Sequence, residues 1–248
     1  GSTGRLLTMA QMEFIRDIVY PFNIESYKRR QALLKEYGKR GPEYSRQAQG
    51  TLFGIENSLK ATLGYQSGLL DQKLMAKKAA EEKALRDAVA EDSEASALYG
   101  KAWDELAAAQ KSYASLYKLY RYFEGGAGFS TTYFGTARSL VRLAFEKSLP
   151  NDARLREYRD AALPALNRRL TTVTPIYDEL EITNLTDSLI QLQKEFGVRL
   201  EVRWLMAGRL AEDAAKDLVQ GTKLGDVEVR KRYLDGGLVH RVPFRMVP

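Results

Sequence analysis

The chain has 248 residues, 44% of them hydrophobic and 28% charged, a composition ordinary for a soluble globular protein of one large or two modest domains. It contains no cysteine, which excludes disulfides, thiol catalysis and cysteine-based metal sites. The formal charge of +6 arises from lysines and arginines that alternate with acidic residues along most of the chain. That pattern is typical of a solvated surface and does not indicate a nucleic-acid footprint.

The apolar runs are too short for a membrane span. The longest, such as SLVRLAF and EVRWLMAG, fall far below the roughly 20 residues that cross a bilayer. The opening GSTGRLLTMAQ lacks the apolar stretch of a secretory signal. We therefore expect no membrane span, and we find no signal peptide in these residues.

The first part of the chain has a helical period. Thr8 and Gln11 have the spacing of a capping box, and the apolar helical period that follows stops at Pro21. A second helix is predicted over Ile24–Tyr37, ending at Gly38.

A glycine-rich helix is predicted next, in the stretch QGTLFGIENSLKATLGYQSG. Each glycine inside a helix costs about 1 kcal/mol relative to alanine, so their presence needs a reason. At roughly 100° per residue they share one narrow face with an amide and an alanine. The residues of this glycine face are Gly50, Gly54, Asn57, Ala61, Gly64 and Gly68.

The glycine face is the candidate binding surface of the chain. Without side chains, it lets a ligand or another backbone approach closely, and the Asn57 amide can both donate and accept a hydrogen bond there. The alternative is that Asn57 bonds locally inside a helix bundle. The residues alone do not choose between these two interpretations.

The glycine-rich helix is predicted to continue past Gly68 into an Ala/Glu/Lys-rich segment. Together they form the first arm of an antiparallel helical hairpin over roughly residues 50–124. The return arm carries an aromatic stripe, which we interpret as packing against the first arm. Its members are Leu106, Tyr113, Tyr117 and Tyr120. The glycine-rich EGGAGFSTTYFG that follows is predicted to be a flexible connection.

The remaining residues also favour helices. One is predicted to stop at Pro150, one to be capped by Asn151, and one to start at Thr174–Pro175 and end at Gly197. AEDAAKDLVQG and DVEVRKRYLDGG are short helices, whereas VRLEVRW resembles a strand. The predicted fold class is all-α, a helical bundle with one long hairpin and an irregular tail over residues 238–248.

The chain has no recognisable catalytic constellation. Its one histidine, His240, lies in the irregular tail, without the nucleophile and carboxylate of a Ser-His-Asp system. One histidine and no cysteine do not support a transition-metal site. The acidic pairs Glu81–Glu82 and Glu91–Asp92 are interpreted as solvated charge on a helix, and EGGAGFS lacks the lysine of a phosphate-binding loop. We expect no metal, no cofactor and no catalytic residue.

Several segments nevertheless resemble one family. GSTGRLLT resembles the Gly-[Ser/Arg/Thr]-Thr-x-Arg-x-Leu-Thr segment of the bacterial dipeptidyl-peptidase 7 and 11 family of serine peptidases. GIENSLKATLGYQSGL is similar to that family's Asn-x-x-Lys-Asn-x-x-Gly helix. Later segments, from YFGTARSLV to VRKRYLDGG, are similar to further helices of the family, so the resemblance runs from Gly1 to about Gly237. VRLEVRWLM and the tail depart from the pattern.

The resemblance implies a role as one part of an enzyme. In that family a chymotrypsin-like double β-barrel carries the catalytic triad, and an inserted α-helical domain caps the cleft. The chain resembles the insertion alone, so residues 1–237 are predicted to be a cap domain that lacks the triad. Its implied partners are the catalytic barrels and a peptide with a free amino terminus. The implied location is the periplasm or the cell surface.

The resemblance also selects residues on the glycine face. Asn57, Lys60 and Gly64 match the family helix, while Ala61 stands where a second asparagine is usual. An asparagine of this domain helps to hold the substrate's amino terminus in the family, and Asn57 is the candidate here. Two rival hypotheses remain: a free-standing helical protein-interaction module and, with less support, a basic helical nucleic-acid binder. The leading hypothesis involves no nucleic acid.

Overall fold

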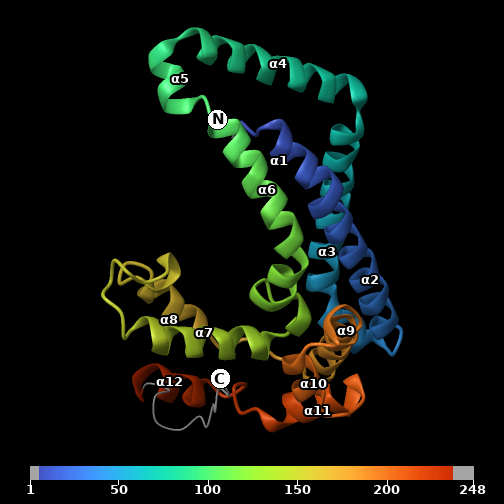
Figure 1. Cartoon of the computed structure of the whole chain (residues 1–248). Helices are drawn as coiled ribbons and strands as arrows, with labels where there is room; N and C mark the ends of the chain where they lie inside the picture. Colours follow the sequence, from blue (N-terminus) through green and yellow to red (C-terminus); the bar gives the residue numbers. More distant parts are fainter. Residues whose placement is uncertain (1–5, 237–248) are drawn as a thin grey trace. The chain divides into compact units, whose positions relative to one another are not determined.

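The computed structural model describes residues 6–236 (Figure 1). Within that range every regular element is helical and no strand occurs, which confirms the predicted all-α class. The chain divides into two compact units, Gly1–Tyr120 and Arg121–Pro248. The limits of the predicted cap domain and hairpin stay predictions.

The first unit is built from six α-helices and a π-turn. They are α1 (Met9–Phe14), the π-turn η1 (Ile15–Val19), α2 (Tyr20–Gly38), α3 (Pro42–Leu70), α4 (Gln72–Glu91), α5 (Ser93–Tyr99) and α6 (Ala102–Leu119). Figure 1 shows α2 and α3 side by side, with α4 and α5 leading from the end of α3 to the start of α6.

At the beginning of the chain, the predicted capping box is present but the predicted helix end at the proline is not. Thr8 Oγ1 accepts a hydrogen bond from the Gln11 backbone N–H at 3.3 Å, and Gln11 Oε1 accepts one from the Thr8 N–H at 2.9 Å, completing the capping box. The predicted helix end at Pro21 is wrong, because Pro21 lies in the first turn of α2. The wider π-turn just before it relieves the clash of the proline ring with the carbonyl four residues earlier.

The core of this unit lies between α2 and α3. Leu34 and Tyr37 from α2 and Ala48 and Ile55 from α3 are all buried. The Tyr37 hydroxyl also donates to Gln47 Oε1 at 2.6 Å, so the buried phenol is satisfied. The short connection after Gly38 makes this pair antiparallel.

The predicted continuation of α3 into the Ala/Glu/Lys-rich segment is wrong. The helix ends at Leu70, and Asp71 is extended and caps α4, since its Oδ1 accepts from the backbone N–H groups of Lys73 at 2.8 Å and Leu74 at 3.2 Å. An aspartate that satisfies the first N–H groups of a new helix competes with continuation of the old one. Asp92 caps α5 in the same way.

The aromatic stripe of α6 packs against a different partner from the one predicted. The Phe14 ring lies 5.4 Å from the Tyr113 ring and 5.6 Å from the Tyr117 ring, and Phe22 lies 5.6 Å from Tyr117. These rings come from the start of the chain and not from the preceding arm. The two contacts to Tyr117 are edge-to-face, a geometry that stabilises the packing of α6 beyond simple burial.

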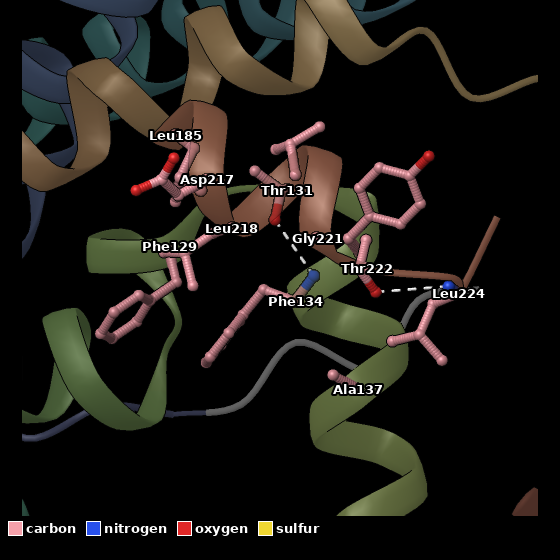
Figure 2. Close-up of a pocket in the computed structure, with 12 residues that line it drawn as sticks. Phe129, Thr131, Phe134, Ala137, Leu185, Asp217, Leu218, Gly221, Thr222 and Leu224 are labelled. Carbon is pink, nitrogen blue, oxygen red and sulfur yellow. Dashed lines mark hydrogen bonds between the residues drawn. The ribbon is translucent and has the colours of Figure 1, made fainter. Parts of the chain in front are cut away.

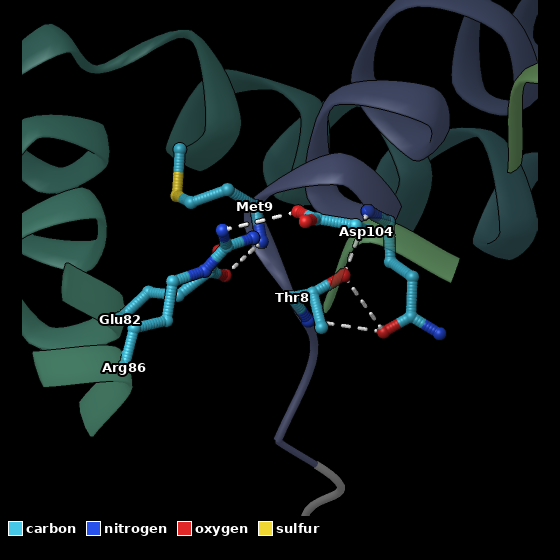
Figure 3. A network of polar contacts seen from close by, with 6 residues as sticks. Thr8, Met9, Glu82, Arg86 and Asp104 are labelled. Carbon is cyan, nitrogen blue, oxygen red and sulfur yellow. Dashed lines mark hydrogen bonds and ion pairs between the residues drawn. The ribbon is translucent and has the colours of Figure 1, made fainter. Parts of the chain in front are cut away.

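A polar cluster fastens α4 to the starts of α1 and α6 (Figure 3). Glu82 accepts a hydrogen bond from the Met9 backbone N–H at 2.6 Å and pairs with Arg86 at 3.2 Å, and its side chain is only 14% exposed. Arg86 in turn reaches Asp104 at 3.4 Å and covers the Trp103 ring at 5.4 Å from its centroid. We call this set the Glu82 clasp.

The second unit is also built from helices. After the π-turn η2 (Tyr120–Glu124) come η3 (Ala127–Phe129), α7 (Thr132–Glu146), η4 (Arg156–Tyr158), α8 (Leu163–Thr171), α9 (Asp178–Phe196), α10 (Leu200–Met206), α11 (Ala211–Gly221) and α12 (Val227–Gly236). α9 and α11 pack closely, and Leu189 on α9 and the small Ala214 and Ala215 on α11 have no surface left exposed. The helices predicted near residues 211–221 and 226–237 are confirmed.

Two segments of this unit differ from the prediction in kind. VRLEVRW is not a strand, because Val202 and Met206, four residues apart, are buried on one side of the helix α10. The glycine-rich stretch is packed and not a loose connection. A Cβ added to buried Gly128 would lie 3.0 Å from Leu192 Cδ1 and 3.2 Å from the Tyr122 carbonyl oxygen.

Two predicted helix starts are also wrong. Asn151 caps no helix, because its Oδ1 accepts from the Asp160 N–H at 2.8 Å within a loop, and α8 begins only at Leu163. α9 begins at Asp178 and not at Thr174–Pro175, with acidic residues in its first turn where the helix dipole favours them. Its predicted end at Gly197 is confirmed. The predicted irregular tail, 238–248, lies outside the described residues.

Candidate functional site

The glycine face is the side of α3 turned away from the core. The buried residues of this helix are Ala48, Ile55 and Thr62, each seven residues from the next. At 100° per residue they lie roughly 120–160° around the helix from Gly50. One side of α3 therefore packs on the unit, and the glycine face is left on the other.

No neighbouring helix fills the space in front of these glycines. A Cβ added at any of Gly50, Gly54, Gly64 or Gly68 would meet no atom within 4 Å among the residues described. Gly50, Gly54, Ala61 and Gly64 are exposed and Gly68 is half-buried. Packing inside the described chain thus gives no reason for the four glycines, and their use as a contact face stays a prediction.

Asn57 lies in the middle of this open face. Its side chain is exposed and makes no hydrogen bond within residues 6–236, so the local bonding considered as the alternative is not found there. Two aromatic side chains on the same helix stand out of the surface nearby: Phe53 is 66% exposed and Tyr65 is 64% exposed. The surface therefore offers a free amide, bare backbone and aromatic rings together.

Glu56, the residue before Asn57, links this part of α3 to α2. Its Oε1 accepts from Lys35 Nζ at 3.0 Å and from Gln31 Nε2 at 3.0 Å, both on α2. The hydrogen bond from Lys35 is the main reason that the pKa of Glu56 lies below its ordinary value. This link ties α3 to α2 one residue before Asn57, and so helps to hold the glycine face outward.

An apolar pocket that no sequence pattern indicated lies in the second unit (Figure 2). It has a volume of about 500 Å³ and is lined mainly by apolar side chains from η3, α7, α9 and α11, among them Phe129, Phe134, Leu185 and Leu218. The Thr131 and Thr222 hydroxyl oxygens at its wall already accept from the backbone N–H groups of Phe134 and Leu224. We find no reactive group free in it.

A buried carboxylate caps α7 beside this pocket. Glu181 accepts from the Thr132 N–H at 2.7 Å, the Thr132 hydroxyl at 2.9 Å and the Tyr133 N–H at 3.2 Å, while burial raises the pKa of Glu181. The Tyr133 hydroxyl donates to Asp178 Oδ1 at 2.7 Å. Burial and this hydrogen bond raise the pKa of Tyr133 to about 12. Both carboxylates are engaged in holding the helix, so they do not form a free acid–base pair.

Other classes of site find no support in the part of the chain that is described. No group of three or more His, Cys, Asp or Glu side chains is placed to hold a metal ion among residues 6–236. None of the helices in that range is both long and apolar enough to cross a bilayer. His240, the sole histidine of the sequence, lies outside the described residues, so no Ser-His-Asp arrangement can be built from them.

Comparison with known families gives one result. The family model described as Peptidase S46 matches residues 1–241. The match therefore takes in α3 with its whole glycine face and both compact units. No curated protein matches the chain.

Proposed function

Because the chain belongs to the peptidase S46 family, we propose that it is the helical domain that caps the catalytic cleft of a serine dipeptidyl-peptidase. The catalytic groups then belong to β-barrel domains outside this chain. Two observations support this division of labour. Every regular element among the described residues is helical, and the sequence lacks the constellation that hydrolysis needs.

The glycine face of α3 is the surface through which the cap works in this proposal. Four glycines on the exposed side of a helix sacrifice stability, because each costs about 1 kcal/mol against alanine. The open space in front of each of them is the observation that carries the proposal. A peptide or a barrel domain lying against this face accounts for glycines that no packing within the described chain explains.

Asn57 then contacts the amino terminus of the bound peptide. Its amide oxygen can accept a hydrogen bond from the α-ammonium, and no residue within 6–236 competes for that oxygen. A cap that closes one end of the cleft and holds a free amino terminus restricts cleavage to the bond that releases a dipeptide from that terminus. In this proposal the enzyme acts in the periplasm or at the cell surface.

Steady-state kinetics of an intact peptidase containing this segment test the proposal. Asn57→Ala should raise KM for a dipeptidyl substrate with a free amino terminus about 10-fold and leave kcat nearly unchanged. The reason is that the lost contact stabilises the bound substrate and the transition state equally. Ser67→Ala, an exposed residue of the same helix away from the glycine face, is the matched control.

The position of the second family asparagine provides a further arm of the same experiment. If Asn57 is the contact, Ala61→Asn leaves KM close to that of the unchanged enzyme. A large fall in KM on Ala61→Asn, with no effect of Asn57→Ala, would assign the contact to position 61 instead.

An interaction module remains the competing function, favoured by the exposed Phe53, Tyr65 and Leu70 on α3. The parent reading frame separates the two functions. Barrel-coding sequence on both sides of this segment supports the cap, and its absence supports the free-standing module.

A further inference from the structure

Two arginines of α7 share one carboxylate at the start of the second unit. Arg138 and Arg142 lie one helical turn apart, and both donate to Glu124. Arg142 binds it through two nitrogens, with Nη1–Oε1 at 2.7 Å and Nη2–Oε2 at 2.5 Å. Both oxygens of Glu124 are thus occupied, and two guanidinium groups are held close together by a single negative charge.

A third arginine reaches the same place from α8. Arg169 Nη2 donates to the Ser139 hydroxyl oxygen at 3.3 Å, next to Arg138 on α7. Arg169 is exposed and pairs with no carboxylate among the described residues. Its guanidinium therefore keeps most of its donors available toward solvent.

Tyr158 contributes the floor of this cluster. Its ring is 5% exposed and packs with Leu140, Leu143, Leu166 and Leu170 between α7 and α8. Its hydroxyl makes no hydrogen bond within residues 6–236. Tyr158 thus packs between α7 and α8, the two helices that carry the arginines. Burial raises the pKa of Tyr158, and the charges of Arg142, Arg138 and Arg169 act on that pKa in the opposite direction.

The charge balance at this place leaves an excess of one positive charge. Arg138 and Arg142 pair with Glu124, Arg169 adds a third positive charge, and the exposed Glu157 is the other carboxylate that acts on both Arg142 and Tyr158. Guanidinium groups bind carboxylates and phosphates in a fixed planar geometry, and a phenol can donate one more hydrogen bond to the same anion. One singly charged oxyanion would neutralise the cluster and satisfy the Tyr158 hydroxyl.

We propose that Arg138, Arg142, Arg169 and Tyr158 form a binding site for an oxyanion, with a carboxylate as the ligand class that fits the net charge. Arg169 and Tyr158 supply the open donors, while Glu124 holds the other two arginines in place. The site is independent of the glycine face and of the proposed cap function, since it lies wholly in the second unit.

The proposal can be tested on the full 248-residue chain by NMR. The chain, labelled with ¹³C in its tyrosine rings, is titrated with sodium acetate at constant ionic strength, and the Tyr158 resonance is assigned by its loss in Tyr158→Phe. A saturable shift of that resonance is expected. Arg169→Ala should weaken the apparent affinity about 10-fold, the size expected for one charge-assisted hydrogen bond.

The matched control is Arg168→Ala, because Arg168 is the exposed neighbour of Arg169 in α8 and its charge is not among those that act on Tyr158. It should leave the titration unchanged. Arg169→Lys keeps the charge and the fold but loses the planar fork, and should also weaken binding.

Three outcomes would overturn the proposal. They are a shift that rises linearly without saturation, an equal titration curve in Arg169→Ala and the unchanged chain, and an equal loss in Arg168→Ala and Arg169→Ala. A parallel titration with sodium phosphate distinguishes the source of the oxyanion. Saturation by phosphate with no response to acetate would overturn the carboxylate assignment.

Discussion

The four glycines of α3 can be replaced one at a time to learn what the exposed face is for. In Gly50→Ala, Gly54→Ala, Gly64→Ala and Gly68→Ala the added methyl meets no atom within 4 Å in the described chain. Two effects of alanine then stabilise the folded chain: its higher helix propensity and the smaller backbone freedom of the unfolded state. No overpacking opposes them. Each variant should therefore be more stable by up to about 1 kcal/mol.

Gly128→Ala is the control in which the same chemical change should have the opposite sign. There the methyl would lie 3.0 Å from Leu192 Cδ1 and 3.2 Å from the Tyr122 carbonyl oxygen, and the backbone oxygen cannot move aside cheaply. Overpacking of this kind typically costs about 1–3 kcal/mol. The sign of the stability change thus depends on the space around each glycine and not on the glycine-to-alanine change itself.

Thermal melts followed by circular dichroism measure both effects. A change of 1 kcal/mol shifts the midpoint by about 2–4 °C in a chain of this size, so the α3 variants should melt up to that much higher and Gly128→Ala lower. A lowered midpoint in most of the four α3 variants would refute the reasoning. It would mean that the glycine face is packed against another surface of the purified protein.

Three further predictions concern activity, pH and the Glu82 clasp. The purified 248-residue chain should release no dipeptide from a dipeptidyl substrate, because it lacks a catalytic triad. Dipeptide release that a serine-directed reagent blocks would contradict this prediction. The pKa of Tyr133 is about 12 when folded, above its ordinary value of 10.0. The contribution of Tyr133 to stability should therefore be complete below pH 10 and be lost as the pH rises through about 12, a slope that Tyr133→Phe removes in denaturant titrations. Glu82→Ala leaves the Met9 N–H without its acceptor and removes one of the two carboxylates that pair with Arg86, and should cost about 1–3 kcal/mol. Glu81→Ala, at the exposed neighbouring position, should cost less than Glu82→Ala because exposed ion pairs contribute little. Equal losses in the two variants would show that the clasp adds nothing.

Helical periodicity was enough to predict the fold class, because apolar residues at helical spacing must bury one side of each element whatever their neighbours are. The breaks were harder to predict. Asp71 interrupts a pattern that is otherwise continuous, and only the hydrogen bonds that its side chain accepts from the N–H groups of Lys73 and Leu74 reveal a new helix. Val202 and the residues around it have strand propensity, but burial of Val202 with Met206 decides for a helix.

The glycine face could be predicted because all its members lie on one helix, where spacing alone assigns them to one side. That it is open to solvent required the structure. The arginine cluster gave no signal in the sequence, because Glu124, Tyr158 and Arg169 come together only when α7 and α8 pack. The apolar pocket was missed for the same reason, since its lining runs from Phe129 to Leu224.

The most direct test of the cap is a crystal structure of an intact peptidase containing this segment, with a dipeptide bound at its catalytic centre. We expect the peptide to lie against the glycine face of α3, with the Asn57 amide oxygen within hydrogen-bond distance, about 2.7–3.2 Å, of the α-ammonium. A glycine face that points away from the bound peptide, with the ammonium held entirely by residues of other domains, would contradict the account.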